Sequence, residues 1–325
     1  MSTDWDRRQF IKRAVIGCAG ISTVSSAAVI ARDAGRDAPQ KNKQVRQIRN
    51  FQVPAKKDKG AGYVVVSKGN KPDLTTRRAI DALGGMSQFI SPGDEVVIKP
   101  NVGWDRTPAQ AANTNPLVVQ ALVQMCFEAK AGKVVVTDNT CNDASRCFTR
   151  SGIWKMAEAA GAEIILPASH RFRDFELGGV VLGTMPVLSP AVSGDKFINV
   201  PIAKHHGLSR FTGAMKNLYG VLGGRRNRLH QKIDDSIADL AEFIRPTLTV
   251  MDATRVLLHN GPQGGNLQDT KAVGEIIVST DQVAVDTYSC GLIGVNPDDL
   301  PYLKLAQARG LGIADLKKLT IKRVS

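Results

Sequence analysis

The segment EVVIKPNVG, residues 95–103, decides the fold because a short β-branched run gives way to a polar end that contains proline and glycine. An apolar run of this length indicates a strand that is buried on both faces of a sheet. Three other segments repeat the pattern: YVVVS (63–67), KVVVT (133–137) and EIIVS (275–279). Strands of this kind are typical of α/β proteins with a mostly parallel sheet.

Segments with helical periodicity separate these strands and supply the crossovers that parallel strands require. We expect helices at residues 74–83, 116–129, 153–160, 233–244, 282–292 and 300–308, and further strands at 163–166, 196–202 and 247–251. Asn115 is placed to cap the second helix. The run FELGGVVLGTMPVL (175–188) predicts a hairpin that turns at Gly178–Gly179 or Gly183. The predicted fold is α/β, a mostly parallel sheet with flanking helices and a small β-hairpin insertion.

Composition limits the classes of partner. The chain has 325 residues, 43% of them hydrophobic and 22% charged, which is enough to bury a sizeable core. Its formal charge of +13 fits a nucleic acid, an anionic membrane surface, an anionic ligand or simply a basic protein. We expect no nucleic-acid partner, because the sequence has neither zinc-finger spacing nor an interleaved aromatic and basic run.

The first residues have the features of a targeting signal. DWDRRQFIKR (4–13) carries a twin arginine, Arg7 and Arg8, and the next 18 residues, 14–31, are uncharged and only mildly hydrophobic. This segment resembles a twin-arginine (Tat) export signal. A lipobox at Cys18 follows too short an apolar region, and a retained anchor would contain too much Gly and Ser to span a membrane well.

Three parts of the chain follow from that resemblance: a Tat signal peptide at 1–31, a linker or extended arm at 32–62, and an α/β domain at 63–325. The Tat translocase would be a partner during export, and the mature product would be periplasmic or otherwise exported. Cleavage after Ala31 removes four cations and two carboxylates, so the charge falls from +13 to +11. We expect no stable membrane span in the mature chain.

Polar side chains follow most of the predicted strands. In open α/β sheets, ligands bind beyond the carboxyl ends of the strands, where loops and helix starts converge. A single Asp or Asn there is more often a turn or a cap, but several together favour a shared cleft. The candidates are Asn101, Asp138, Asn139, His205, Lys216, Asn217, Arg225, Arg226 and Asp252.

These candidates divide by chemistry. His205, Asp138 and Lys216 are the catalytic candidates, because they transfer protons or hold charge. Metal ligation is assigned to Asp138, His205 and Asp252. Adjacent residues of an extended segment point to opposite sides, so at most one of His205 and His206 usually faces a given site, and His205 is the preferred one. An anionic small molecule is the expected ligand of Asn101, Asn139, Asn217, Arg225 and Arg226. The glycine-containing stretch around Lys216 lacks the Gly-Lys-Ser/Thr pattern of a nucleotide P-loop.

Four cysteines remain after the signal. Cys126 and Cys290 lie in helical patterns and are expected to be buried thiols. Cys141 and Cys147 flank NDASR, and they are open to a local disulfide, to metal ligation or to neither. No C-x-x-C run occurs, so an iron–sulfur cluster is the less favoured cofactor and a metal ion the more favoured one.

Four stretches carry a resemblance: VVIKPNVG (96–103), VVVTDNT (134–140), INVPIAKHHGLSRFTGAMKNLYG (198–220) and STDQVAVDTYSCGLIG (279–294). Together they resemble the domain-of-unknown-function-362 family, including its Tat-exported members, over most of residues 63–310. Some members carry an added ferredoxin domain and are described as iron–sulfur proteins. The cysteine run of that domain does not occur in this sequence, so the resemblance does not imply a ferredoxin domain here. The arrangement of His, Gly and Lys is also similar to that of lactate-racemase-type proteins, without a role to transfer.

Three hypotheses about function follow. The first is an exported enzyme or cofactor protein that binds an anionic small molecule, with a metal as an optional partner. The second is an iron–sulfur or other electron-transfer protein. The third is a non-catalytic periplasmic ligand-binding protein that uses the same strand ends.

Overall fold

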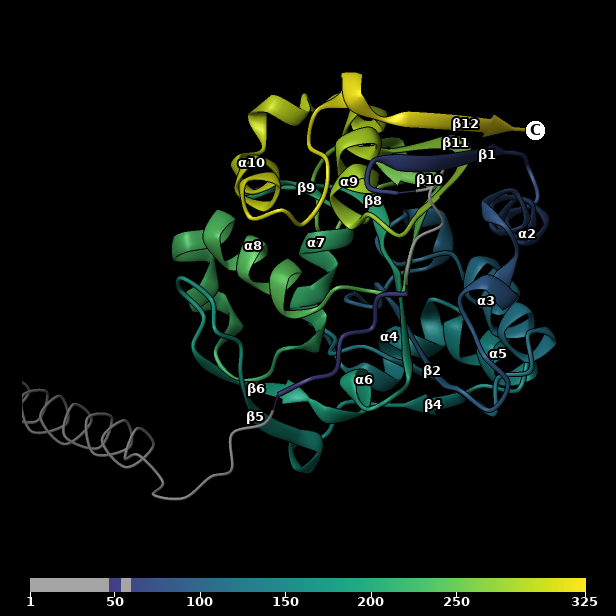
Figure 1. Cartoon of the computed structure of the whole chain (residues 1–325), viewed down its shortest axis with the longest axis horizontal. Coiled ribbons are helices and arrows are strands. Elements are labelled where there is room, and N and C mark those ends of the chain that lie inside the picture. Colours follow the sequence, from purple (N-terminus) through teal and green to yellow (C-terminus); the bar gives the residue numbers. More distant parts are fainter. Residues whose placement is uncertain (1–46, 54–59) are drawn as a thin grey trace, which may run out of the picture. The chain divides into compact units, whose positions relative to one another are not determined.

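A computed structural model describes residues 47–53 and 60–325 (Figure 1). The expected signal at 1–31 and most of the expected arm at 32–62 lie outside the described residues. Within the part of the arm that is described, Phe51 is 2% exposed and its ring lies 5.6 Å from that of Phe197, between centroids. This stretch therefore contributes to the core rather than acting as a free linker.

Strands alternate with helices along the described chain. The strands are β1 (Tyr63–Lys68), β2 (Glu95–Pro100), β3 (Lys133–Thr137), β4 (Glu163–Ile165), β5 (Phe172–Glu176), β6 (Thr184–Leu188), β7 (Lys196–Val200), β8 (Ile202–His206), β9 (Arg210–Thr212), β10 (Leu248–Leu257), β11 (Thr270–Ser279) and β12 (Thr320–Val324).

The α-helices are α2 (Pro72–Leu83), α3 (Pro116–Glu128), α4 (Ala144–Arg150), α5 (Ile153–Ala159), α6 (Ser189–Val192), α7 (Ala214–Asn217), α8 (Ile233–Phe243), α9 (Gln282–Ser289) and α10 (Pro301–Ala308). Short 3₁₀ helices include Leu218–Val221, Arg226–Lys232 and Cys290–Ile293. Asn115 caps α3 as predicted, accepting a hydrogen bond from the Leu117 N–H at 3.0 Å. No helix in the described ranges has both the length and the hydropathy to cross a membrane.

The main sheet has the order β12-β1-β11-β10-β7-β2-β3-β4, with β8 beside β10 and β9 beside β8. Pairing is parallel from β10 through β7, β2 and β3 to β4, and also between β1 and β12 and between β8 and β10. The antiparallel pairs are β1–β11, β10–β11 and β8–β9. The prediction of a mostly parallel α/β fold is confirmed, and β5–β6 forms the separate hairpin.

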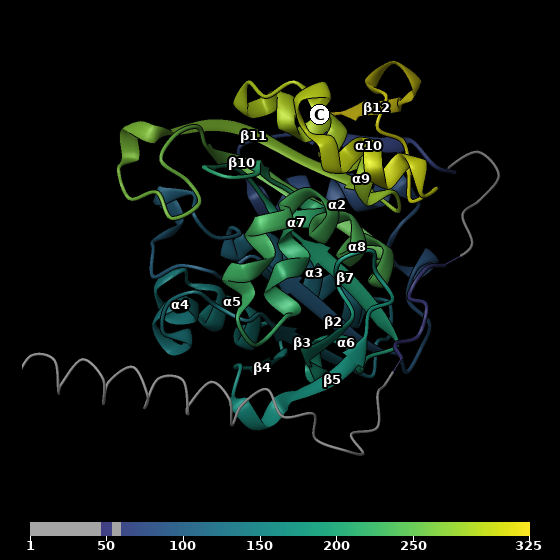
Figure 2. The same ribbon diagram turned by 90° about the vertical axis from the view of Figure 1, so that its left-hand side faces the viewer.

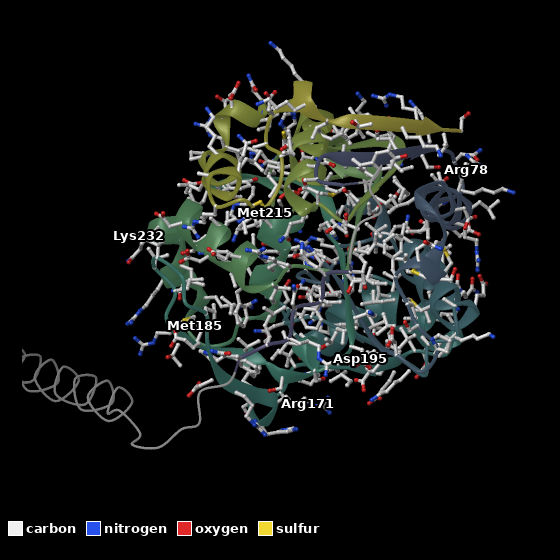
Figure 3. All side chains as sticks on the ribbon, viewed as in Figure 1. Arg78, Arg171, Met185, Asp195, Met215 and Lys232 are labelled. Carbon is white, nitrogen blue, oxygen red and sulfur yellow. The ribbon has the colours of Figure 1, made fainter. Side chains whose placement is uncertain are left out.

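Helices cover both faces of this sheet, which explains why its strands are apolar on both sides. On β2, Val96 and Ile98 pack into the core beneath α2, α3 and α5, whereas Val97 packs into the core shared by α7, α8, α9 and α10. Figures 1 and 2 show the two groups of helices on opposite sides of the strands. Figure 3 shows the contrast between a core side chain, Met215, and an exposed one, Lys232.

Two strands extend further than the sequence predicts, and both extensions matter for the site. The strand expected at 196–202 breaks at Pro201, which lacks an N–H for the ladder, and resumes as β8 through His206. The strand expected to end at residue 251 continues as β10 to Leu257. Asp252 is therefore inside a strand and does not follow one.

Asp281, between β11 and α9, connects the segment before β1 with a segment near the C-terminus. Its carboxylate accepts hydrogen bonds from the Ala284 N–H at the start of α9, from the Gly62 N–H before β1 and from the Ile313 N–H near the C-terminus, at 2.9, 2.9 and 3.0 Å. Asp281 therefore caps α9. The same side chain fixes β1 beside the segment that leads into β12.

Replacing Asp281 by Ala should destabilise the chain by about 2–4 kcal/mol, since it removes a cap and leaves two largely buried N–H groups without acceptors. Urea unfolding followed by circular dichroism measures this loss. Asp298→Ala, at an exposed acidic position, is the matched control and should change the midpoint little. Equal stability of the two variants would contradict the assigned role.

Candidate functional site

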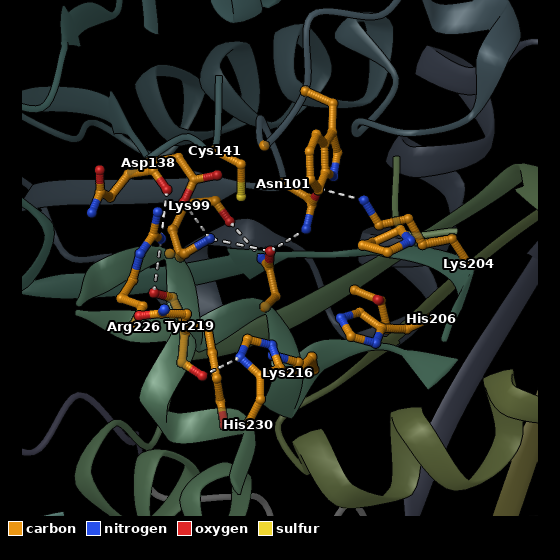
Figure 4. Close-up of a pocket in the computed structure, with 18 of the residues that line it drawn as sticks. Lys99, Asn101, Asp138, Cys141, Lys204, His206, Lys216, Tyr219, Arg226 and His230 are labelled. Carbon is orange, nitrogen blue, oxygen red and sulfur yellow. Dashed lines mark hydrogen bonds and ion pairs between the residues drawn. The ribbon is translucent and has the colours of Figure 1, made fainter. Parts of the chain in front are cut away.

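A cavity of about 450 Å³ opens beyond the carboxyl ends of β2 and β3, beside β8 and α7 (Figure 4). Its position is the one expected for a ligand site in an open α/β sheet. The residues that line it are Lys99, Asn101, Gly103, Trp104, Asp138, Asn139, Cys141, Lys204, His206, Thr212, Lys216, Asn217, Tyr219, Gly220, Gly224, Arg226, Asn227, His230 and Pro262.

A buried ion pair forms the base of the cavity. Lys99 is the next-to-last residue of β2, and Asp138 directly follows β3. The parallel pairing of these strands therefore brings the two side chains together. Lys99 Nζ lies 2.7 Å from Asp138 Oδ1, and both side chains are almost fully buried. Burial lowers the pKa of Lys99, and the Asp138 charge opposes that shift. Asp138 Oδ2 also accepts the Val102 N–H at 2.8 Å.

Gly220 makes room for this pair. A Cβ atom at Gly220 would lie 1.9 Å from Asp138 Oδ1 and 2.7 Å from Lys99 Nζ. Any side chain at this position would therefore clash with both partners. The Gly220 carbonyl also accepts the Asn139 N–H at 2.7 Å, which joins the segment after β3 to the segment after α7.

Asn217 links the ion pair to the rest of the cavity. Its Oδ1 accepts from Lys99 Nζ at 3.1 Å and from Asn101 Nδ2 at 2.9 Å, while its Nδ2 donates to Asn199 Oδ1 at 2.8 Å. Every amide in this chain of contacts has a fixed orientation because both of its ends are engaged. Asn101 and Asn217 are therefore part of the cavity's framework.

Lys204 is 1% exposed and extends this network from β8. Its ammonium donates to Asn101 Oδ1 at 3.0 Å and to the Ala112 carbonyl at 2.5 Å. No carboxylate within the described chain forms an ion pair with it. Burial lowers its pKa to about 7; Cys141 and the Asp138 charge oppose that shift, and the Lys99 charge acts in the same direction as burial.

Lys216 reaches the cavity from α7 and is 6% exposed. Its Nζ lies 3.2 Å from the centroid of the Tyr219 ring, a cation–π contact. Burial lowers its pKa to about 7, and the charges of Arg226 and Lys204 act in the same direction. Two lysines of the same cavity are therefore near the midpoint of their titration at neutral pH.

His206 contributes a neutral imidazole. Its Nδ1 accepts the N–H groups of Leu208 and Ser209 at 3.1 and 3.2 Å, so the ring proton is assigned to Nε2. Burial and, to a smaller extent, the charge of Lys216 lower the pKa of His206 to about 3. Its ring stacks on that of His230 with 6.0 Å between centroids.

Arg226 fastens the far wall. Its guanidinium donates to the carbonyls of Asn139 and Thr140, both at 2.9 Å, and to that of Tyr219 at 3.3 Å. These contacts hold the segment after β3 against the segment after α7. Arg226 therefore adds positive charge to the cavity from a fixed position.

Asp286 of α9 positions Lys216 without touching the cavity. Its carboxylate accepts the N–H groups of Ala214 and Met215 at the start of α7. A Cβ at Gly213 would lie 2.1 Å from Asp286 Oδ1, which explains the glycine two residues before Met215. Burial raises the pKa of Asp286 to about 7. The D-x-V-A-V-D stretch therefore supplies two structural carboxylates, Asp281 and Asp286.

Among the nine residues that the sequence singled out, the structure brings six to the cavity: Asn101, Asp138, Asn139, Lys216, Asn217 and Arg226. The other three, His205, Arg225 and Asp252, are not among the described residues that line it. The expected shared cleft is therefore present, but the residues that line it are only partly those expected.

His206, and not His205, faces the cavity, which reverses the preference drawn from the sequence. Both residues are in β8, so alternate side chains point to opposite sides, and His206 shares its side with Lys204. His205 Nδ1 accepts the Gly261 N–H at 3.1 Å on the other side. The alternation expected of an extended segment is therefore present, with His206 on the cavity side and His205 on the other.

Asp252 has a structural environment. Its Oδ2 accepts the Asn115 N–H at 2.7 Å, and its Oδ1 accepts from the backbone and the hydroxyl of Thr254 at 2.9 and 2.7 Å. It is fully buried within β10. Its carboxylate therefore holds the start of α3 against the sheet.

The metal set expected at Asp138, His205 and Asp252 does not form. Asp138 is engaged by Lys99, and the other two carry their own backbone donors away from the cavity. Across residues 47–53 and 60–325, no three His, Cys, Asp or Glu side chains gather in a way that could hold a metal ion. The donors present among the described residues do not fit the expected metal.

The four described cysteines are all free thiols. Cys126, Cys147 and Cys290 are buried, and Cys141 is exposed on the cavity wall. Cys147 belongs to α4, which the sequence did not predict. Of the alternatives that the sequence left open for Cys141 and Cys147, the disulfide is not formed in this structure. These thiols do not gather into a set that would fit an iron–sulfur cluster.

The sequence reasoning missed several lining residues, above all Lys99, Lys204, His206, Trp104, Tyr219 and His230. Two signals were available. Lys99 is a lysine inside a run of otherwise buried strand residues, which is rare unless the charge has a partner. Lys204 and His206 alternate as residues of one strand do. His230 and Tyr219 offered no comparable signal, because only the tertiary fold brings their segment to the cavity.

Comparison with known proteins finds similar sequences and structures. The chain is 26% identical over 244 residues to a thylakoid-associated protein of Synechocystis sp., a match that covers 72% of this chain and 74% of that one. The lactate racemase apoprotein of Thermoanaerobacterium thermosaccharolyticum aligns with a TM-score of 0.42 and 13% identity over 78% of this chain and 62% of that one.

A Thermotoga maritima protein solved as a structural-genomics target aligns with a TM-score of 0.40 and 10% identity, over 70% of this chain and 60% of that one. The chain thus spans less than two thirds of each of these two structures. A family model, "Domain of unknown function (DUF362)", matches residues 96–291, which include β2, β3, β8, α7 and α9. The chain belongs to the DUF362 family.

Proposed function

We propose that this chain binds a small anionic molecule in the strand-end cavity and acts on it as an enzyme. The observation that carries the proposal is the imbalance of buried charge. Among the described residues that line the cavity, Lys99, Lys204, Lys216 and Arg226 are basic, and Asp138 is the single carboxylate. One ion pair neutralises Lys99, and three basic side chains remain.

Burying positive charge without a partner is costly, because the low-dielectric interior removes hydration and strengthens repulsion between cations. Burial is the main cause of the lowered pKa values of Lys204 and Lys216. A bound anion would offset this cost and would raise both pKa values again. The cavity is therefore arranged so that it is more stable with an anion than without one.

The proposed catalytic role follows from the groups beside the anion. Lys204 and Lys216 can each gain or lose a proton near neutral pH, and His206 presents an N–H from a neutral ring. A pure binding protein needs charge but not side chains poised to titrate. Turnover of a bound ligand separates the enzyme from the non-catalytic alternative.

Lys204→Met and Lys216→Met should each weaken the binding of sulfate or oxalate by about 10- to 100-fold, the range expected when one charge-assisted hydrogen bond to an anion is lost. Isothermal titration calorimetry at constant ionic strength measures the effect. Both probes are fully ionised near neutral pH, so changes in affinity report on the protein.

Lys155→Met is the matched control, because Lys155 is an exposed lysine of α5 away from the cavity. Its affinity for the two anions should equal that of the unmodified chain. Anion affinity that is unaffected by both cavity variants, or lowered equally by Lys155→Met, would contradict the proposed site. Circular dichroism confirms that each variant is folded.

We also propose that the chain is exported through the Tat pathway and acts outside the cytoplasm. The support is the twin arginine in DWDRRQFIKR followed by an uncharged, mildly hydrophobic stretch. Nothing in the cavity's chemistry requires a particular compartment.

Changing Arg7 and Arg8 together to Lys should leave the protein in the cytoplasm of a bacterium with a Tat system, because Lys keeps the charge but not the twin-arginine motif. Immunoblotting of periplasmic and cytoplasmic fractions measures the distribution. Equal periplasmic amounts of the double variant and the unmodified chain would reject Tat export.

A further inference from the structure

We propose that Lys216 is a nucleophilic amine that forms an imine with the carbonyl carbon of an anionic ketone or aldehyde held in the cavity. This inference rests on the proposed anion site and names the class of compound that the site would take. It concerns a single nitrogen atom, Lys216 Nζ, and therefore makes a prediction at one position of the sequence.

The three cavity lysines differ in how their amines are held. Lys99 Nζ is engaged by Asp138, Asn217 and the Pro100 carbonyl. Lys204 Nζ has two oxygen acceptors, Asn101 Oδ1 and the Ala112 carbonyl. These contacts fix both groups as donors.

Lys216 is different. In the described part of the chain its Nζ has no recorded oxygen acceptor or carboxylate partner, and its contact is the face of the Tyr219 ring. An amine that is not tied to oxygen acceptors loses no hydrogen bond when it loses its proton, and its lone pair is then available. Figure 4 shows Lys216 beside Tyr219 and His230.

The charges around Lys216 make the unprotonated amine accessible at neutral pH. Burial, Arg226 and Lys204 lower its pKa to about 7, whereas Cys141 acts in the opposite direction. The uncharged groups nearby are Tyr219, His206 and His230. Burial and the charge of Lys216 lower the pKa values of the two imidazoles. About half of the Lys216 amines are then free base at pH 7, in contrast to well under 1% for an ordinary lysine of pKa about 10.4.

The surrounding groups suit the rest of the reactant. Lys204 and Arg226 supply positive charge for a carboxylate or phosphate, and the His206 Nε2–H can donate to a carbonyl oxygen. After attack, the product nitrogen is a protonated imine, which is again a cation over the Tyr219 ring. The cation–π contact therefore stabilises the product as well as the resting ammonium.

The step balances without any oxidant or reductant. The lone pair of the neutral amine forms a bond to the carbonyl carbon, and the C=O π electrons move to oxygen. A proton transferred from the attacking nitrogen to that oxygen gives a carbinolamine. The hydroxyl then takes one proton, from water or from the Lys204 ammonium, and leaves as water. A protonated imine between Lys216 and the former carbonyl carbon remains.

Reductive trapping tests this directly. The full chain is incubated with pyruvate or with dihydroxyacetone phosphate in the presence of cyanoborohydride, and the modified peptide is identified by mass spectrometry. Acetone and dihydroxyacetone are the uncharged counterparts of the two probes. We expect a reduced adduct on Lys216 that forms at least about tenfold faster with at least one anionic ketone than with its counterpart, as one charge-assisted contact predicts.

The pH dependence adds a second readout. Only the free base attacks, and at probe concentrations far below saturation the trapping rate reports the unliganded protein. Under those conditions the rate of trapping at Lys216 should rise with pH and reach half of its maximum near pH 7. Trapping at exposed lysines such as Lys155 should continue to rise toward pH 10. If the probes differ, carboxylate and phosphate are distinguished by which of the two anionic ketones is trapped.

Lys216→Arg separates this inference from the anion site on which it rests. Arginine keeps the positive charge but is not a nucleophile at these pH values, so the variant should still bind sulfate by calorimetry and should lose the adduct. Sulfate binding by the unmodified chain without an adduct on Lys216 would overturn the imine and leave the anion site standing. An adduct that forms mainly on Lys204 would also overturn the assignment.

Discussion

The buried ion pair between Lys99 and Asp138 is the interaction on which the rest of the site depends. It joins the carboxyl ends of two parallel strands, and it requires a residue without a side chain at position 220. Breaking a buried pair by removing one partner costs about 3–5 kcal/mol, because the other charge stays buried and unpaired. Asp138 is the one carboxylate among the described residues that line the cavity, and it pairs with Lys99. Lys204 and Lys216 therefore have no carboxylate partner within the cavity.

The remaining residues of the family stretches divide into those that hold the frame and those that face the ligand space. Asp281 and Asp286 are buried carboxylates whose acceptors are filled by backbone N–H groups, and Asn217 orients the amides around the ion pair. Lys204, Lys216 and His206 keep donor capacity directed into the cavity. This division explains why one short stretch, residues 198–220, contains both rigid glycine positions and titratable side chains.

Much of the fold could be predicted from the sequence, because β-branched runs and helical periodicity are local signals. The strand at 95–99, the helix after Asn115 and the hairpin near residue 180 are where those signals placed them. Predictions failed where tertiary pairing decided the outcome. Because β8 pairs with β9 and β10, it extends to His206. Because β10 pairs with β11, it continues beyond Asp252. The pairing of β8 places His206 on the cavity side, and the length of β10 puts Asp252 inside a strand.

Alkylation of Cys141 measures the charge of the cavity without knowledge of its ligand, because this thiol is exposed on the cavity wall while the other described thiols are buried. The rates with iodoacetate and iodoacetamide, compared with those of free cysteine and mapped to the Cys141 peptide, give the local preference for an anionic reagent. We expect the preference for iodoacetate to exceed that of free cysteine, to fall with salt and to fall in Lys204→Met and Lys216→Met. A preference equal to that of free cysteine, unchanged by these substitutions, would contradict the claim that the cavity attracts anions.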